Sequence, residues 1–182
     1  MASQAFEDFS HVIQDSVDLM HHFDTLNVLP PPSGIEVLKR ASLVMALAAL
    51  ETYFEDRVSE AATAACANNH SEESLKRFYK NSLEQDLKSF HSPTVDRVRT
   101  IYTKYLNLDV TEGWSWNNCN NVEAKSRLND LVKKRGDIAH RSLRPMPGLP
   151  VVHAVTRDDL RKHIHFIKEL VNATEVYLES KL

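Results

Sequence analysis

Apolar residues recur every three or four positions over long stretches of the chain, which is the spacing of amphipathic helices. A first helix is predicted from Ser3 to about Leu26, and three consecutive prolines after it end the helix. A second helix is predicted from Ser33 to about Asn68. Its expected start is a capping box, with Ser33 as the cap and Glu36 three residues later. The first half of this helix is apolar on nearly all sides, which is typical of the centre of a bundle.

The rest of the chain predicts further helices joined by short connections. A third helix begins near Ser71, a short fourth one after Ser92 and Pro93, and a fifth runs from an Asn121 cap to about Arg141. Thr156 marks the start of a last helix. The expected apolar faces are Leu75, Phe78, Tyr79, Leu83 and Leu87 in the third helix, and Leu160, Ile164, Ile167, Val171, Thr174 and Leu178 in the last.

These patterns predict an all-α bundle of five to six helices in a single domain, residues 1–182. Residues 1–32 form the N-terminal helix and its proline-rich turn. Residues 106–120 read as a polar loop, and residues 151–155 are compatible with a short extended segment.

Composition narrows the class of function. The chain has 22 Lys and Arg against 25 Asp and Glu, so any nucleic-acid site must come from local clustering of basic residues. Two isolated cysteines make no disulfide framework, and the histidines lack the spacing of a metal site. The N-terminus lacks the pattern of a signal peptide, and the longest apolar run, residues 43–50, is too short to span a bilayer. We therefore expect a cytoplasmic protein with no membrane partner, no metal and no other cofactor.

Two short stretches carry a resemblance to a known family. Residues 133–141 read Lys-Lys-Arg-Gly-Asp-Ile-Ala-His-Arg at the predicted end of the fifth helix. They resemble the Arg-x4-His signature of the HEPN superfamily, whose members often have Arg-Asn-x-x-Ala-His at a helix end. Residues 48–53, Ala-Ala-Leu-Glu-Thr-Tyr, resemble the Ala-x-x-Glu-x-Tyr stretch on the central helix of bacterial HEPN proteins, especially the RiboL-PSP-HEPN group. The likeness extends over roughly residues 33–182.

The resemblance implies an all-α bundle that usually dimerises, with the motif helices of two chains meeting in one cleft. Many members are metal-independent endoribonucleases, and others only bind. We therefore expect RNA as a partner and a homodimer with a shared active site. An antitoxin or another effector would be a further partner.

The positions of Arg135 and His140 favour such a shared site. They point about 140° apart on a regular helix, because each residue turns the helix by about 100°. A cleft between two chains would let each chain supply both groups from opposite sides. RNA cleavage without a metal needs a base, an acid and a cation beside the phosphate, and two His with two Arg would supply them.

Glu51 and Asp137 are the acidic candidates for residues of the catalytic site. Glu51 follows a very apolar run, so we expect it to be partly buried and to hold Arg135 by a salt bridge. The alternative is an exposed residue that pairs with its neighbours Glu55 and Arg57 or makes a cap contact. Gly136 stands where the family often has Asn, Asp or His. Asp137 comes one position later, about 100° away, where it is a candidate partner for His140 or Arg141.

A basic cluster surrounds the motif and is the best candidate for a phosphate-binding surface. Its expected RNA-binding residues are Lys133, Lys134, Arg141 and Arg144. A solvated helix end, where cations stabilise the helix dipole, is the alternative. In the preceding loop, Trp114 and Trp116 are expected to anchor the loop to the bundle more than to stack on bases.

Two functions, one enzymatic and one of binding alone, are compatible with these observations. The first is a metal-independent endoribonuclease that cleaves single-stranded RNA or tRNA loops, as a toxin or phage-defence effector. The second is a non-catalytic HEPN adaptor that binds a partner protein or nucleotide. The basic motif favours the first, whereas Gly136 and the net acidic charge favour the second.

Overall fold

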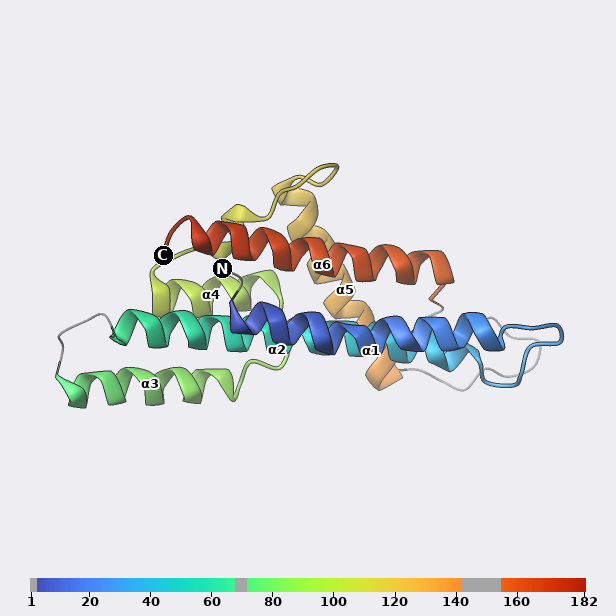
Figure 1. Ribbon diagram of the computed structural model, residues 1–182, viewed down its shortest axis with the longest axis horizontal. Coiled ribbons are helices and arrows are strands. Elements are labelled where there is room, and N and C mark those ends of the chain that lie inside the picture. The colour runs from blue at the N-terminus through green and yellow to red at the C-terminus, as the bar shows by residue number, and fades with distance from the viewer. Residues whose placement is uncertain (1–2, 68–71, 142–154) are drawn as a thin grey trace.

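The computed structural model describes residues 3–67, 72–141 and 155–182, apart from the side chain of Arg141. In this part of the chain there are six α-helices and one short 3₁₀ helix (Figure 1). This architecture confirms the predicted all-α fold. The helices are α1 (Gln4–Leu26), α2 (Glu36–Ala67), α3 (Glu73–Leu87), α4 (Val95–Leu106), η1 (Val110–Gly113), α5 (Asn121–Arg141) and α6 (Arg157–Glu179).

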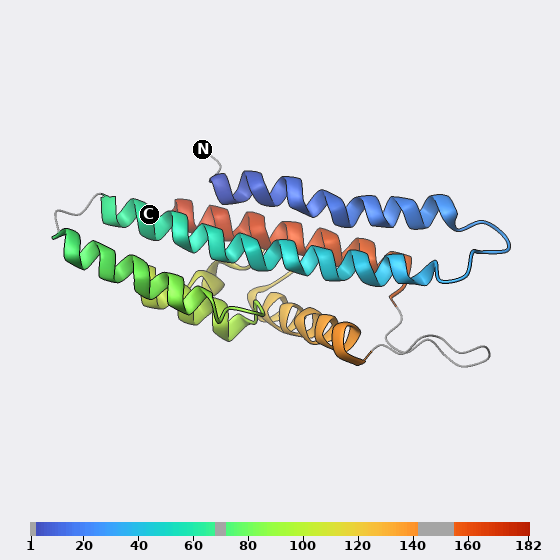
Figure 2. The ribbon, with the colours of Figure 1, turned by 90° about the horizontal axis from the view of Figure 1, so that it is seen from below.

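Helix α2 is the centre of the bundle, as its apolar sequence predicts. It contacts each of the other five α-helices. Figure 2 shows α2 and α6 between α1 on one side and α3, α4 and α5 on the other. The interior of α2 is fully buried at Leu43, Leu47, Leu50 and Phe54. The predicted stripe of α6 is also buried along its whole length, from Leu160 to Leu178.

The capping box predicted for α2 is wrong. The helix begins at Glu36, three residues after Ser33. Gly34 has a φ of 82°, which belongs to the left-handed region and interrupts a right-handed helix. Glu36 forms an ion pair with Lys39 at 2.7 Å instead of closing a capping box.

Two other helix starts lie beside their predicted caps. Helix α4 is capped by Thr94, whose Oγ1 accepts from the backbone N–H of Arg97, and not by Ser92. Helix α5 follows Asn120, whose Oδ1 accepts from the N–H of Glu123 at 3.0 Å. The adjacent Asn121 has a different role, because its side-chain amide donates to the carbonyl oxygen of Thr111.

The start of α6 is as predicted. The Oγ1 of Thr156 accepts from the N–H of Asp159 at 3.1 Å and donates to its carboxylate at 2.7 Å. This reciprocal cap fixes where α6 begins. The extended segment predicted at residues 151–155 lies outside the described residues except for Val155, which is buried.

Only part of the predicted apolar face of α3 packs on the core, where Tyr79 and Leu87 lie against it beside Leu83. Leu83 is buried, but Leu75 and Phe78 are 57% and 69% exposed. Helix α3 lies at the periphery, with α2 as its main neighbour, so its first turns have no second helix to cover them (Figure 2).

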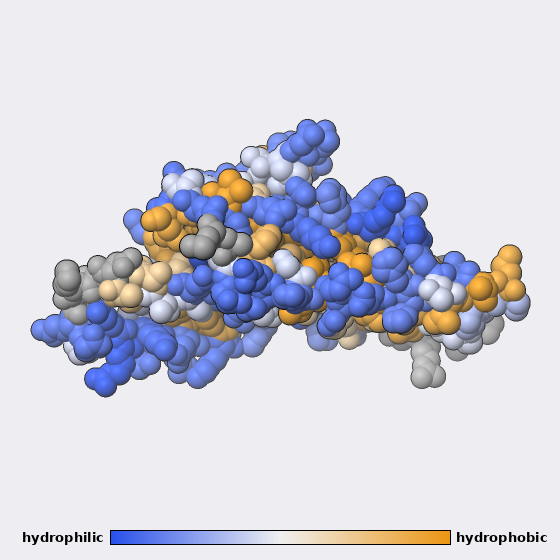
Figure 3. Space-filling model, viewed as in Figure 1, coloured by the Kyte–Doolittle hydropathy of each residue, from blue (hydrophilic) through white to orange (hydrophobic). Residues whose placement is uncertain are grey.

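In Figure 3 the front face is largely hydrophilic, and hydrophobic side chains gather at the tip formed by the turn after α1.

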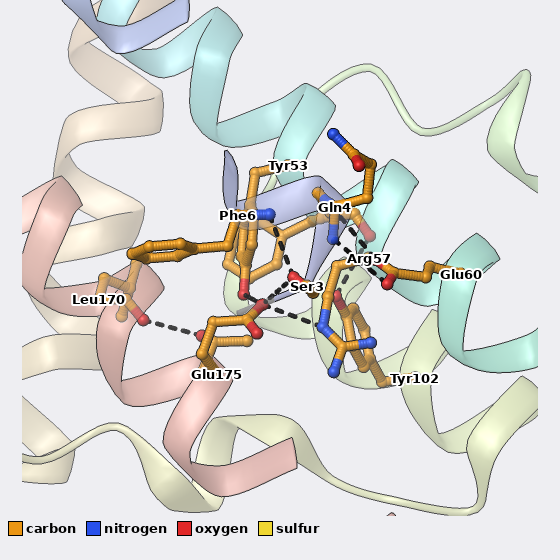
Figure 4. A network of polar contacts seen from close by, with 12 residues as sticks. Ser3, Gln4, Phe6, Tyr53, Arg57, Glu60, Tyr102, Leu170 and Glu175 are labelled. Atoms are coloured by element: carbon orange, nitrogen blue, oxygen red, sulfur yellow. Dashed lines mark hydrogen bonds and ion pairs between the residues drawn. The ribbon is translucent and has the colours of Figure 1, made fainter. Parts of the chain in front are cut away.

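A buried polar network ties the start of α1 to α2 and α6 (Figure 4). One carboxylate oxygen of Glu175 accepts hydrogen bonds from Ser3, Tyr53 and Arg57 at 2.9, 2.7 and 2.9 Å. The Arg57 and Glu175 side chains are only 8% and 10% exposed. Removing one partner of such a buried pair would leave an uncompensated charge, so the network fixes the register of α2 against α6.

The loop before α5 is anchored by its tryptophans, as expected. Trp114 is fully buried, and its indole N–H donates to the Oγ1 of Thr174 at 3.0 Å. Trp116 is half-buried against Phe166, with 5.6 Å between ring centroids. None of the helices in the described ranges is long and apolar enough to cross a membrane.

Candidate functional site

The predicted ion pair between Arg135 and Glu51 is present. The Nη1 of Arg135 donates to a Glu51 oxygen at 2.8 Å, and the two side chains are 26% and 18% exposed. Arg135 lies four residues after Leu131 and three before Ile138, both buried, so it shares the face of α5 that is turned toward α2. The local helix pattern thus directs the guanidinium toward the edge of the core.

The same nitrogen also donates to the backbone carbonyl of His91 at 3.1 Å. His91 is exposed in the connection between α3 and α4. This contact has no sequence signal, because any residue offers a carbonyl and only the tertiary fold brings it near. Both contacts use Nη1, and a guanidinium carries further donors on Nη2 and Nε. Arg135 is therefore held from one side and retains N–H groups that suit a phosphate.

His140 differs from Arg135 in its surroundings. It is exposed at the end of α5, and among the described residues no hydrogen bond or ion pair joins it to Arg135. This arrangement agrees with the angular separation predicted for one helix. A single chain therefore presents Arg135 at the α2–α5 contact and His140 to solvent.

Gly136 and Asp137 are half-buried between these two residues. A Cβ built on Gly136 would meet nothing within 4 Å, so no neighbour in this chain requires a glycine there. Asp137 takes part in a polar or electrostatic contact of its own.

The described side chains of the predicted basic cluster have different surroundings. Lys133 is exposed, whereas Lys134 is half-buried and close enough to His163 of α6 to influence its protonation. The side chain of Arg141 and the whole of Arg144 lie outside the described residues. The cations are neighbours in the sequence, but consecutive positions on a helix point about 100° apart, so adjacent cations do not share one face.

Glu55 is a neighbour of the site that sequence reasoning missed. It lies one turn after Glu51 on α2 and is half-buried. Burial, with the negative charges of Glu51 and Asp56, raises the pKa of Glu55 to about 7. The acidic run Glu-x-x-x-Glu-Asp in α2 is the signal from which this crowding was foreseeable. A second carboxyl group that titrates near neutral pH therefore lies next to the Glu51–Arg135 pair.

Comparisons with known proteins identify the family. The RiboL-PSP-HEPN family model matches residues 7–180, so the match takes in most of α1 as well as the two motif stretches. No curated protein and no solved structure gives a significant match to the chain. The matched range contains the Glu51–Arg135 pair and His140, together with all the helices described above apart from the first three residues of α1. The chain belongs to the RiboL-PSP-HEPN family.

Proposed function

We propose that the chain is a metal-independent endoribonuclease that cuts single-stranded RNA or tRNA loops, with Arg135 and His140 as its working residues. Family membership indicates a nuclease-like or RNA-related module. The observation that carries the finer proposal is the fixed Arg135, anchored by Glu51 and the His91 carbonyl beside an exposed His140. A toxin or phage-defence role would suit such an activity.

The proposed reaction is an internal transfer at phosphorus. The RNA 2′-oxygen forms a bond to the adjacent phosphorus, and the bond to the 5′-oxygen of the next nucleotide breaks. One histidine takes the 2′-OH proton and a second gives a proton to the departing 5′-oxygen. Arg135 stabilises the charge on the phosphate oxygens. The products are a 2′,3′-cyclic phosphate and a 5′-hydroxyl.

A site with two copies of His140 requires two chains, and the outer face of α5 suits this proposal. Val122, Ser126, Lys133 and His140 recur at spacings of four and seven and are all exposed. A homodimer that packs along this face would bring two His140 side chains together. Each Arg135 would enter the shared site from its own α2–α5 contact.

The test uses the single substitution His140→Ala. We expect it to lower the cleavage rate of labelled single-stranded RNA by about 10²–10⁴-fold, because a positioned acid or base is lost. The fold should remain intact because His140 is exposed. Cleavage in EDTA should equal cleavage without it, and the products should carry cyclic phosphates.

His11→Ala is the matched control, since His11 is exposed on α1 far along the chain from the motif. Equal cleavage by the wild type and His140→Ala, both folded by circular dichroism, would refute the assignment of His140. If neither cleaves, the adaptor function is favoured. That alternative has its own support, because the Arg135 guanidinium already engages Glu51 and a backbone carbonyl.

A further inference from the structure

A second basic surface lies where α5 and α6 meet, on a face of α5 other than the one that holds Arg135. We call it the α5–α6 basic cluster, and it consists of Arg127 and Lys134 from α5 with Lys162 from α6. The three surround His163: burial, together with the charges of Lys134, Arg127 and Lys162, lowers the pKa of that imidazole to about 4. Arg127 also donates to the carbonyl of Lys162 at 3.3 Å, which ties the two helices at this point.

In the part of the chain that the structure describes, the three cations of the α5–α6 basic cluster lack the ion pairs that seven other cations have. The seven with such partners are Lys39, Arg57, Lys76, Arg99, Lys104, Arg135 and Arg157. The pKa of Asp159 is lowered by its hydrogen bond from the Thr156 hydroxyl and by the charges of His163, Lys134 and Lys162, so this one carboxylate partly offsets the cluster without forming an ion pair with it.

The charge of this region stands out in a net acidic chain. Residues 121–168 contain eleven of the 22 Lys and Arg but only five of the 25 Asp and Glu. Positive charge is therefore concentrated on α5, the first half of α6 and the segment between them. A surface of this kind attracts a polyanion even when the whole protein is acidic.

An aromatic side chain lies next to the cluster. The Arg127 guanidinium is 4.7 Å from the centre of the Phe166 ring, and Trp116 packs on the same ring. Phe166 is buried, whereas Trp116 is only half-buried. Cations beside a partly exposed indole are the combination that holds single-stranded nucleic acid, through phosphates and through base stacking.

We propose that the α5–α6 basic cluster binds the phosphodiester backbone of single-stranded RNA, with Trp116 as a stacking contact for a base. The surface extends the site at Arg135 and His140, and to that extent it rests on the proposed function. Lys162 and Arg127 would act in binding and not in bond cleavage.

The experiment measures binding with a probe that cannot be cut. A fluorescein-labelled 2′-O-methyl oligouridylate lacks the 2′-hydroxyl nucleophile, so its affinity is independent of catalysis. The double substitution Lys134→Glu with Lys162→Glu should weaken binding about tenfold or more. It should also lower the slope of log affinity against log salt by about 1.4, because two phosphate contacts are lost. Binding should quench the fluorescence of Trp116, since Trp114 is fully buried.

The matched control reverses two exposed lysines elsewhere, Lys80→Glu with Lys181→Glu, and changes the net charge equally. If both double variants lose affinity to the same extent, the attraction is general and the proposal is overturned. No binding by the wild type would overturn it too. Preferential binding to phosphatidylserine vesicles would replace nucleic acid with a membrane surface.

The two proposals fail separately. If the uncut probe binds through the cluster but the wild type cleaves no RNA, the binding proposal is supported and the nuclease proposal is refuted. Cleavage that depends on His140 but not on Lys134 and Lys162 would do the reverse.

Discussion

At the scale of single residues, the surroundings of Glu55 disfavour its negative charge. Its pKa is raised to about 7 by burial and by the neighbouring carboxylates Glu51 and Asp56. Glu51 is compensated by Arg135, and Glu55 lies one turn further along α2. Ionised Glu55 is therefore less stable in the folded chain than in the unfolded chain.

Replacing Glu55 should reveal this conflict. Because the folded-state pKa lies above the ordinary value of 4.5, the wild type should lose stability as the pH rises from about 4.5 to about 7. Glu55→Gln should remove this loss and raise the Tm at pH 8 by about 2–4 °C, equivalent to about 1 kcal/mol after allowance for solvent screening. Thermal unfolding at pH 5 and pH 8 measures the effect. Glu84→Gln is the control, because Glu84 is an exposed residue of α3. A lower Tm for Glu55→Gln at pH 8 would contradict it.

At the scale of elements, α5 combines the site with a local weakness. Gly136 lies within the last turns of the helix, with helical geometry and with open space where a Cβ would be. Glycine in a helix interior costs up to about 1 kcal/mol relative to alanine, because its unfolded backbone has more freedom to lose. In one chain nothing described compensates this cost.

Gly136→Ala should therefore stabilise the monomeric fold by about 0.5–1 kcal/mol, measured by urea unfolding. Ala139→Gly, at an exposed position of the same helix, is the mirror control and should destabilise by a similar amount. A destabilising Gly136→Ala would instead show that something approaches the backbone closely at this point.

Much of the element pattern, and part of the site, follows from the sequence. The apolar periods of α2 and α6 predict their burial, and the run before Glu51 predicts its partial burial. The contact of Glu51 with Arg135 is expected from the role proposed for the motif and not from the spacing. Periodicity does not reveal what covers a face, so Leu75 and Phe78 are exposed despite their spacing. The His91 carbonyl and the division between Lys133 and Lys134 depend on tertiary direction, which spacing alone does not give.

At the scale of the whole molecule, the outer face of α5 is the proposed contact between two copies. Its exposed residues include Val122, which is 77% exposed, and His140. We expect light scattering at micromolar concentration to give twice the chain mass of 20.7 kDa. Val122→Arg should shift the protein toward the monomer and reduce cleavage, because charge repels charge across a two-fold interface.

Val176→Arg is the control, since Val176 is 68% exposed on α6 and makes the same change of size and charge. A wild type that remains a monomer would exclude the shared site. A dimer that Val122→Arg leaves intact, with full cleavage, would exclude the outer face of α5 as the contact.

The central position of α2 has a consequence for cooperativity. Since α2 contacts all five other helices, it cannot separate from the bundle without exposing the main apolar core. Helix α3, with its open outer turns, is free to fray alone, whereas α2 opens only with the whole chain. Glu51 belongs to that last-opening element, so the anchor of Arg135 persists through local fluctuations elsewhere. The Glu51 side of the pair is therefore as durable as the global fold, whereas Arg135 depends on the last turns of α5.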